Sequence, residues 1–170
     1  ANLAMHGCDV MVNVGARFDD RVTGKLAAFA PGATKIHIDI DPANINKNVR
    51  VDVPVVGDAG RALAMLIEAW NRDGGKQDRA AVTEWWRRID AWRAKDSLKF
   101  TQRLDKGAVI KPQYAIRRLW EKTRERDAYI TTEVGQHQMW AAQHYKFDKP
   151  NRWMTSGGLG TMGYGLPAAM

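Results

Sequence analysis

The feature that most constrains the fold of this chain is a set of three short apolar, β-branched stretches near its start. They are residues 9–14, 34–40 and 51–56. Each has the length of a β-strand, and each runs into turn residues: Gly15, Asp41-Pro42 and Gly57-Asp58. Short strands of this kind, separated by helical segments, predict part of an open α/β sheet.

Helices are predicted between and after these strands. A short helix is expected at Leu26–Ala30, and a longer one over residues 59–70. The longer helix has Asp58 as its N-cap and carries at helical spacing the apolar residues Ala62, Leu63, Leu66, Ile67 and Trp70. Pro54 cannot donate a ladder hydrogen bond, so the third strand is expected to be short or to lie at a sheet edge.

A polar, glycine-rich stretch at 71–79 marks the predicted boundary of this first region. The helix that follows has an apolar face expected to pack on a domain: Val82, Trp85, Trp86, Ile89 and Trp92. Pro112 is suited to the first turn of another helix, whose buried face is expected to be Ile116, Leu119 and Trp120. Strands at 128–132 and 153–156, with helices at 136–145 and from 163, predict a second α/β region. The predicted division is therefore 1–71, a basic helical connector at 72–111, and 112–170.

The positive net charge of the chain is concentrated in one segment. Residues 72–126 hold 16 Lys and Arg against 8 Asp and Glu, a net of +8, while the remainder holds 10 against 11. Because these cations are mixed with acids and tryptophans, we expect a solvated connector rather than a nucleic-acid surface. No apolar run is long enough to span a membrane, and the single Cys8 excludes an internal disulfide and favours a buried thiol.

The strongest local signal for a ligand is Gly15-Ala-Arg-Phe-Asp-Asp-Arg-Val-Thr-Gly24. A glycine at the end of a strand lets a ligand approach the backbone, and Arg17 and Arg21 could bind a diphosphate as planar forks. Asp19 and Asp20 could orient these arginines or accept hydrogen bonds from ligand hydroxyls. The alternative is a salt-bridged surface loop, and spacing alone does not separate the two interpretations.

The ends of the next two strands add acids and a further glycine. Asp39 and Asp41 end the second strand, 24 and 26 residues after Gly15, where nucleotide-binding sheets bind ribose hydroxyls. For Asp41 a helix-capping role before Pro42 is equally compatible with the sequence. Together with Gly57-Asp58, these ends predict one ligand lying across the edge of the sheet.

The C-terminal region contains Gly158-x-Gly160-x-x-Gly163, formally a dinucleotide-binding pattern between a strand and a helix. With Gly157, these glycines indicate that a ligand or a second backbone comes very close. Upstream, Gly135–Trp140 places polar groups at a strand-to-helix turn that favours an anion, although spacing alone favours a core role for His137. His6 is expected at the surface, and no metal-ligand cluster or nucleophilic triad can be assembled.

These segments resemble the acetolactate synthase (acetohydroxyacid synthase) family, catalytic large subunit of the bacterial type, over essentially the whole chain. The Gly15–Gly24 run is similar to the FAD-binding segment of the family's central domain, and Ile36-His-Ile-Asp-Ile-Asp-Pro42 and Val53-Pro-Val-Val-Gly-Asp58 match its next two strands. Gly135–His144 and Ser156–Ala169 resemble the opening of the thiamine-diphosphate domain. The resemblance implies parts of two open parallel-sheet domains, joined by the connector and belonging to an internal fragment.

The resemblance also implies roles by position. FAD would be lined by Gly15, Ala16, Arg17, Asp19, Arg21, Val22, Asp39, Ile40, Asn44, Gly57, Asp58, Ala59, Gln138, Met139, Gly157 and Gly158. Thiamine diphosphate would contact Gln136 and His137 through its diphosphate and Gly160 and Met162 through its aminopyrimidine. Asp20 would lie near the substrate channel. No catalytic residue and no metal ligand is expected within this chain, because the activating glutamate and the magnesium site of the family fall outside it.

The implied reaction is decarboxylation of pyruvate and transfer of the hydroxyethyl unit to a second pyruvate or 2-oxobutanoate, for branched-chain amino acid biosynthesis. The resemblance further implies cytoplasmic homodimers or homotetramers and a possible regulatory small subunit, with no nucleic-acid or membrane partner. The chain alone is expected to be inactive and prone to aggregate. The alternatives are another FAD and thiamine-diphosphate enzyme, of the pyruvate oxidase or glyoxylate carboligase type, a stand-alone nucleotide-binding module, or a nucleic-acid-binding protein.

Overall fold

The computed structural model describes residues 1–95 and 97–170, and the chain divides into two compact units. The first unit ends at Lys95, and the second comprises the described residues that follow. Both units combine parallel strands with helices, so the predicted α/β class is confirmed. The proposed three-part division with a connector at 72–111 stays a prediction.

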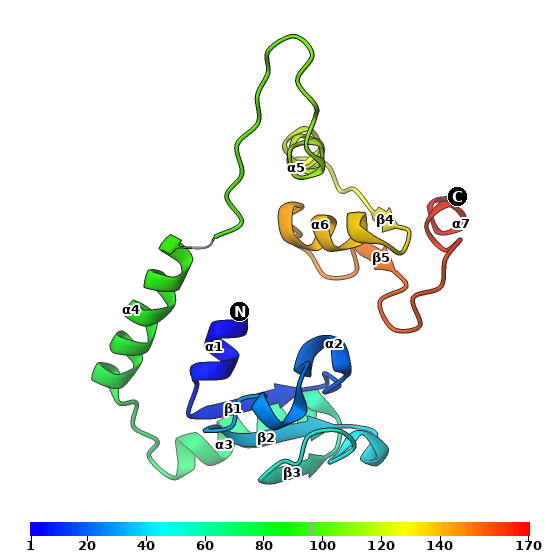
Figure 1. The fold of residues 1–170 in the computed structure, drawn as a ribbon. Coiled ribbons are helices and arrows are strands. Elements are labelled where there is room, and N and C mark those ends of the chain that lie inside the picture. Colours follow the sequence, from blue (N-terminus) through cyan, green and yellow to red (C-terminus); the bar gives the residue numbers. More distant parts are fainter. Residues whose placement is uncertain (96) are drawn as a thin grey trace. The chain divides into compact units, whose positions relative to one another are not determined.

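The first unit is built on a three-stranded parallel sheet in the order β1-β2-β3 (Figure 1). The strands are β1 (Val10–Val14), β2 (Thr34–Asp39) and β3 (Val53–Val56), which confirms the three predicted stretches. The central strand β2 carries His37 and Ile38, whose side chains are fully buried. The strand with Pro54 has four residues and lies at an edge, as its missing backbone donor requires.

The helical segments of the first unit are α1 (Asn2–Gly7), α2 (Asp20–Thr23), α3 (Ala59–Arg72) and α4 (Arg79–Lys95), with 3₁₀ turns η1 (Leu26–Ala28) and η2 (Pro42–Asn44). Asp58 caps α3 as predicted, because its carboxylate accepts a hydrogen bond from the backbone N–H of Arg61 at 2.9 Å. The sequence did not predict α1, α2 or η2. The turns α2 and η2 span four and three residues, too few for a helical period to be visible.

The core of the first unit is centred on Phe18, Val49 and Val51, and Met11, Phe29 and Ile45 pack against it. The Phe18 ring meets the Phe29 ring edge-on at 5.8 Å between centroids and the His37 ring at 5.0 Å. Phe18 lies in a highly charged run, between Arg17 and Asp19, yet it anchors the loop after β1 to the sheet. A charged loop with one buried aromatic residue is therefore fixed in position.

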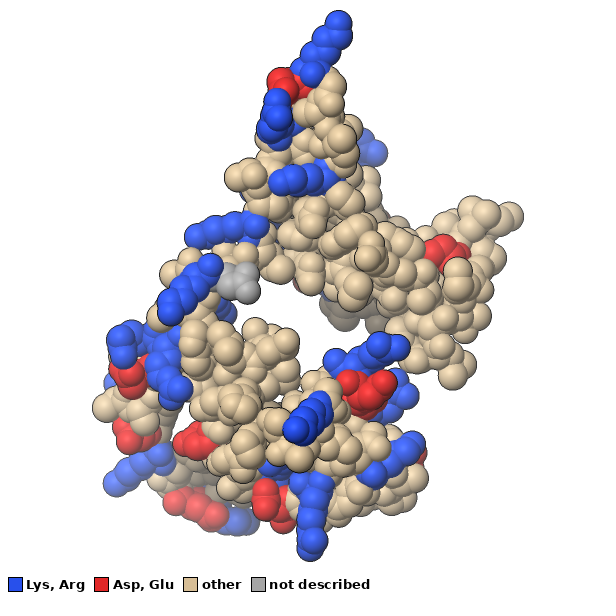
Figure 2. Space-filling model, viewed as in Figure 1, with Lys and Arg blue, Asp and Glu red and all other residues tan. Residues whose placement is uncertain are grey.

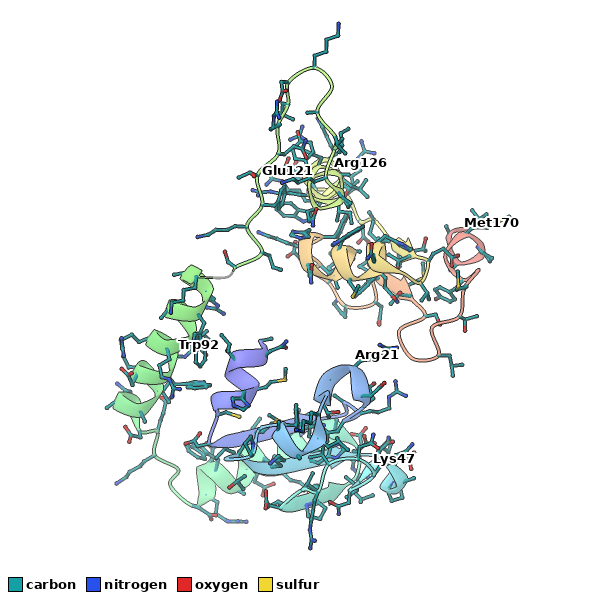
Figure 3. The ribbon with its side chains drawn as sticks, viewed as in Figure 1. Arg21, Lys47, Trp92, Glu121, Arg126 and Met170 are labelled. Atoms are coloured by element: carbon teal, nitrogen blue, oxygen red, sulfur yellow. The ribbon has the colours of Figure 1, made fainter. Side chains whose placement is uncertain are left out.

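The apolar face predicted for α3 is exposed in the structure. Leu63, Leu66, Ile67 and Trp70 retain between 42% and 63% of their accessible surface. The apolar face predicted for α4 is more buried than that of α3. Its residues Val82, Trp85, Ile89 and Trp92 are half-buried, and Trp86 is exposed. Figure 3 shows Trp92 on the side of α4 that faces α1, and a β-carbon built on Gly7 would lie 3.5 Å from its ring.

The second unit has a parallel strand pair, β4 (Ile130–Thr132) and β5 (Trp153–Thr155), with helices α5 (Pro112–Thr123), α6 (Gln136–His144) and α7 (Gly165–Ala169). Pro112 occupies the first turn of α5, as predicted. Of the face predicted for α5, Ile116 and Trp120 are half-buried, whereas Leu119 is exposed. The phenol of Tyr145, just after α6, lies 2.7 Å from the Thr123 hydroxyl and joins the two helices.

Lys and Arg side chains are interspersed with Asp and Glu over the visible face of α4 (Figure 2). Arg87 pairs with Glu84 at 2.7 Å and Arg93 with Asp90 at 3.1 Å along the same helix. This arrangement agrees with a solvated helix and gives no continuous basic stripe on α4. None of the described helices is both long and apolar enough to span a bilayer.

Candidate functional site

The carboxyl ends of the three strands in the first unit lie side by side. The backbone N–H of Gly15 donates to the Ile38 carbonyl at 2.8 Å, and that of Gly57 donates to the Asp39 carbonyl at 2.9 Å. The structure therefore brings together the three turns that the sequence singled out. Such an edge is where open α/β sheets bind their ligands.

The loop after β1 combines an open backbone with exposed guanidinium groups. Gly15 has a φ of 65°, and a β-carbon built on it would meet nothing within 4 Å. Arg17 lies 3.6 Å from Asp19, which also caps α2 by accepting from the backbone N–H of Val22. Arg21 and Asp20 are exposed and form no ion pair within the described residues (Figure 3). The structure therefore supports both interpretations of this loop. Arg17 takes part in a salt bridge, whereas the guanidinium group of Arg21 is free to bind a diphosphate.

The loop is held from beneath by two side chains. The Asn13 amide donates to the carbonyl oxygen of Ala16 at 2.6 Å, and Nε2 of His37 lies 3.2 Å from the same oxygen. Because that oxygen accepts, Nε2 carries the hydrogen. The Nδ1 atom of His37 is buried and has no partner among the described residues.

Asp39 is buried rather than facing solvent. One carboxylate oxygen accepts from the backbone N–H of Asp41 at 2.8 Å, and the other accepts from the Asn44 amide at 3.3 Å. The Asp41 N–H lowers the pKa of Asp39. Asp41 itself caps η2 by accepting from the backbone N–H of Ala43, which is the structural role that the sequence left open. In this geometry, both acids shape the turn after β2.

The remaining residues predicted on this edge line its rim. Ile40 is 70% exposed and Val22 is 46% exposed. Gly57 leaves open space where a β-carbon would stand. Ala16 is exposed, Ala59 and Asn44 are half-buried, and Asp58 is exposed while its carboxylate caps α3.

A second set of predicted residues follows β4. The helix α6 begins at Gln136, directly after Gly135, so its first backbone N–H groups lie at the carboxyl end of β4. Gln136 and His137 are both exposed. The core role that spacing favoured for His137 is therefore wrong, because a buried histidine would have to lie on the opposite side of α6. An exposed helix N-terminus favours an anionic group.

Gln138 belongs to a buried network that the sequence did not predict. Its amide donates to the Thr155 hydroxyl at 2.6 Å, and the Thr132 hydroxyl donates to the same oxygen at 2.7 Å. The indole N–H of Trp153 donates to the Thr132 hydroxyl at 3.2 Å. The network joins α6 to both strands of the sheet. Met139, the next residue of α6, is 58% exposed.

No second backbone among the described residues comes close to the four glycines between β5 and α7, so of the two expectations for them only a ligand contact stays a prediction. A β-carbon on Gly157 or Gly160 would come no nearer than 3.8 Å to another atom, and Gly158 and Gly163 have open space. Gly160 and Gly163 have φ values of 68° and 88°, so their role is conformational. The close backbone approach occurs at Gly165, where a β-carbon would lie 2.7 Å from the Glu133 nitrogen.

Glu133 makes a long-range contact to the glycine-rich segment that sequence reasoning missed. Its two carboxylate oxygens accept from the backbone N–H groups of Gly163 at 2.8 Å and Gly165 at 2.5 Å. The Gly163 N–H is the main reason why the pKa of Glu133 is lowered. The partners lie 30 and 32 residues away, and no local pattern connects them.

The remaining candidate residues do not form a metal or ligand site within the part of the chain that the structure describes. Within residues 1–95 and 97–170, no three His, Cys, Asp or Glu side chains gather as a metal ion would require. His6 is exposed, as expected. Cys8 is half-buried, and its thiol donates to the Met5 carbonyl at 3.2 Å.

Each of the two units contains a segment that matches a known protein family. Residues 1–66 match the thiamine pyrophosphate enzyme central domain, and residues 133–170 match the thiamine pyrophosphate enzyme C-terminal TPP binding domain. The two matches cover more than half of the 170 residues. The second match starts at Glu133 and contains both the α6 N-terminus and the glycine-rich segment.

Curated relatives match along the whole chain. Over all 170 residues it is 51% identical to the acetolactate synthase isozyme 3 large subunit of Escherichia coli and 45% identical to the acetolactate synthase large subunit of Haemophilus influenzae. It is 45% identical over 167 residues to the acetolactate synthase of Mycobacterium leprae. The chain spans 29%, 29% and 26% of the length of these relatives. The chain belongs to the thiamine pyrophosphate enzymes, in the group that contains the acetolactate synthase large subunits.

Proposed function

We propose that the full-length protein containing this chain is an acetolactate synthase. It would decarboxylate pyruvate and join the remaining two-carbon unit to a second pyruvate or to 2-oxobutanoate, in branched-chain amino acid biosynthesis. The observation that carries the proposal is 51% identity to an acetolactate synthase large subunit over all 170 residues, a span that contains both units. The catalytic and substrate-selecting groups would come largely from parts of the protein outside this chain, with Asp20 contributing to the substrate channel.

Thiamine diphosphate would lie at the carboxyl end of β4 and β5. Gln136 and His137, at the exposed N-terminus of α6, are suited to its diphosphate. Gly160 and Met162 would contact its aminopyrimidine, and the Met162 side chain, 79% exposed, offers apolar surface for a ring. When bound, the cofactor supplies the carbon nucleophile and the electron sink, and the protein supplies orientation.

FAD would lie along the strand ends of the first unit. The open backbone at Gly15 and Gly57 and the available guanidinium of Arg21 fit a diphosphate, and exposed Ile40 and Val22 fit an aromatic ring system. Asp39 fits less well, because both its oxygens are already hydrogen-bonded within the turn. We assign to it the shaping of this turn, with Asn44, rather than a ribose contact. Gln138, Met139, Gly157 and Gly158 stay proposed FAD contacts on the resemblance alone; the Gln138 amide donates one N–H to Thr155 and keeps its other N–H and its oxygen for a ligand.

The remaining partners are proposed on the same basis. Magnesium would be bound by residues outside this chain and would offset the negative charge of the cofactor diphosphate. The protein would be a cytoplasmic homodimer or homotetramer of catalytic subunits with a possible regulatory subunit. These properties go with the proposed activity and share its tests.

The NAD-binding alternative is not favoured by the geometry of Gly158-x-Gly160-x-x-Gly163. A dinucleotide fingerprint forms the tight turn that opens a helix directly after a strand, so that the pyrophosphate meets the helix N-terminus. Here β5 ends at Thr155 and α7 begins only at Gly165, and α7 has five residues. The strand-to-helix turn that has the right geometry for an anion is Gly135-Gln136.

Cofactor add-back tests the proposed function. The full-length protein is freed of cofactors, and pyruvate consumption is measured after adding thiamine diphosphate, magnesium and FAD singly and together. We expect consumption only when thiamine diphosphate and magnesium are both present, with FAD required for full activity. Consumption without thiamine diphosphate, or none with all three present, would contradict the proposal.

A further inference from the structure

The glycine-rich segment and the helix after it are bound by one carboxylate that lies far away in the sequence. Glu133 stands just beyond the end of β4, and both its oxygens accept backbone hydrogen bonds, from Gly163 at 2.8 Å and from Gly165 at 2.5 Å. A carboxylate that accepts two backbone N–H groups with separate oxygens fixes the direction of the chain between them. It also satisfies the first backbone donor of the short helix α7, the N–H of Gly165.

Close backbone packing reinforces this contact. Gly165 is buried, and a β-carbon built on it would lie 2.7 Å from the Glu133 nitrogen and 2.9 Å from the Thr132 carbonyl carbon. The backbone of Gly165 thus rests directly on the end of β4. The side chain and the main chain of Glu133 therefore both fix the position of the turn at Gly163–Gly165.

The segment between β5 and this turn has few other supports. The Ser156 hydroxyl accepts from the backbone N–H of Thr161 at 2.8 Å and closes a turn over residues 156–161, which leaves the end of the segment to be held by other contacts. Leu159 and Met162 are 95% and 79% exposed, so they contribute little packing. Gly160 and Gly163 have positive φ values and allow many other conformations. The conformation of residues 157–163 consequently depends on the Glu133 carboxylate.

We infer that Glu133 is a positioning residue for the thiamine diphosphate site: its carboxylate sets the glycine-rich segment that contacts the aminopyrimidine. The inference rests on the proposed function of this segment. Glu133 does not touch the cofactor and acts through Gly163 and Gly165. An amide at this position could accept only with its oxygen, and its NH₂ group would face a backbone N–H, so the charge and both acceptors are required.

The test uses the full-length protein with thiamine diphosphate and magnesium, measured by calorimetric titration and by activity at saturating cofactor. We expect Glu133→Gln to weaken cofactor binding about ten-fold or more, the usual effect of losing a charged hydrogen bond, and to change kcat less than about three-fold. Glu133→Asp, which keeps the charge, should recover part of the affinity. Asp127→Asn is the matched control, because Asp127 is exposed, precedes β4 and binds only Arg152 and Lys149.

Unchanged cofactor affinity in Glu133→Gln, or an equal loss in Asp127→Asn, would overturn the inference. A wild-type protein that binds no thiamine diphosphate would instead overturn the proposed function itself. If Glu133→Gln does not fold, amide exchange in the wild type decides the question. Slow exchange of the Gly163 and Gly165 amides supports the inference, and exchange as fast as at an exposed glycine such as Gly158 contradicts it.

Discussion

The Nε2 atom of His37 lies 3.2 Å from the carbonyl oxygen of Ala16, so a fully buried side chain of the central strand fixes the loop that follows the first strand. The same ring packs edge-on against Phe18, which belongs to that loop. One residue therefore ties the exposed backbone of Gly15 and Ala16 to the core of the first unit.

Replacing His37 by alanine should destabilise this loop. The change removes a hydrogen bond and leaves a cavity beneath Phe18, which together cost about 2–4 kcal/mol. The expected result is a lower apparent unfolding temperature of the full-length protein and weaker FAD binding, measured by thermal unfolding and flavin absorbance. His6→Ala, at an exposed histidine, should change neither. Equal effects of the two substitutions would contradict the role of His37.

Arg21 should contribute to FAD affinity more than Arg17 does. Arg21 is exposed and forms no ion pair within the described residues, whereas Arg17 already lies 3.6 Å from Asp19. Arg21→Ala is expected to lower flavin affinity about ten-fold, through loss of a charge-assisted hydrogen bond to the diphosphate. Flavin retained after gel filtration measures this effect, and Arg93→Ala on α4 serves as the control. Full retention in Arg21→Ala would argue against a diphosphate at this loop.

Gly165→Ala should disturb the second unit strongly. The added methyl group would lie 2.7 Å from a backbone nitrogen, and such overpacking costs about 1–3 kcal/mol. We expect a lower unfolding temperature together with weaker thiamine diphosphate binding. Gly32→Ala, where a β-carbon meets nothing within 4 Å, should be neutral. Wild-type stability of Gly165→Ala would contradict the close contact between Gly165 and the backbone of Glu133.

Asp127 should make stability depend on pH in the acid range. Hydrogen bonds from Arg152, and then from Lys149, lower the pKa of Asp127 from 3.8 to about 2. Since the folded pKa lies below the unfolded value, the stabilisation is complete above pH 3.8 and is lost as the pH falls towards 2. Wild type and Asp127→Asn should therefore differ in unfolding temperature at pH 6 and converge near pH 2. A constant difference over this range would show that the ion pairs with Asp127 contribute no stability.

The sequence predicted the elements better than the contacts among them. Strands β1, β2 and β3 could be predicted because β-branched residues end at glycine, proline or acid, and the parallel order then brought the three turns together. Phe18 could not be identified as core, because its neighbours in sequence are charged and the burial arises from residues such as Val49 and Val51. In a segment of charged residues, a single aromatic residue gives no periodic apolar pattern from which its burial could be predicted.

The predicted site residues show the same limit. Spacing could not show that Asp39 is buried beneath its own turn or that His137 is exposed. Whether a side chain is buried depends on which face of its strand or helix is covered, and spacing does not determine that face. Glu133 could not be found at all, since its two partners lie beyond β5. The apolar face of α3, with Leu66 and Trp70, is exposed, and helical spacing shows only that such a face exists.

The proposed joining of two 2-oxo acids can be followed directly with ¹³C-labelled pyruvate by NMR, with the full-length protein, thiamine diphosphate, magnesium and FAD. We expect 2-acetolactate as the product, with one carbon dioxide released for two pyruvates consumed. Acetaldehyde or acetate as the main product, or no conversion of pyruvate, would contradict it.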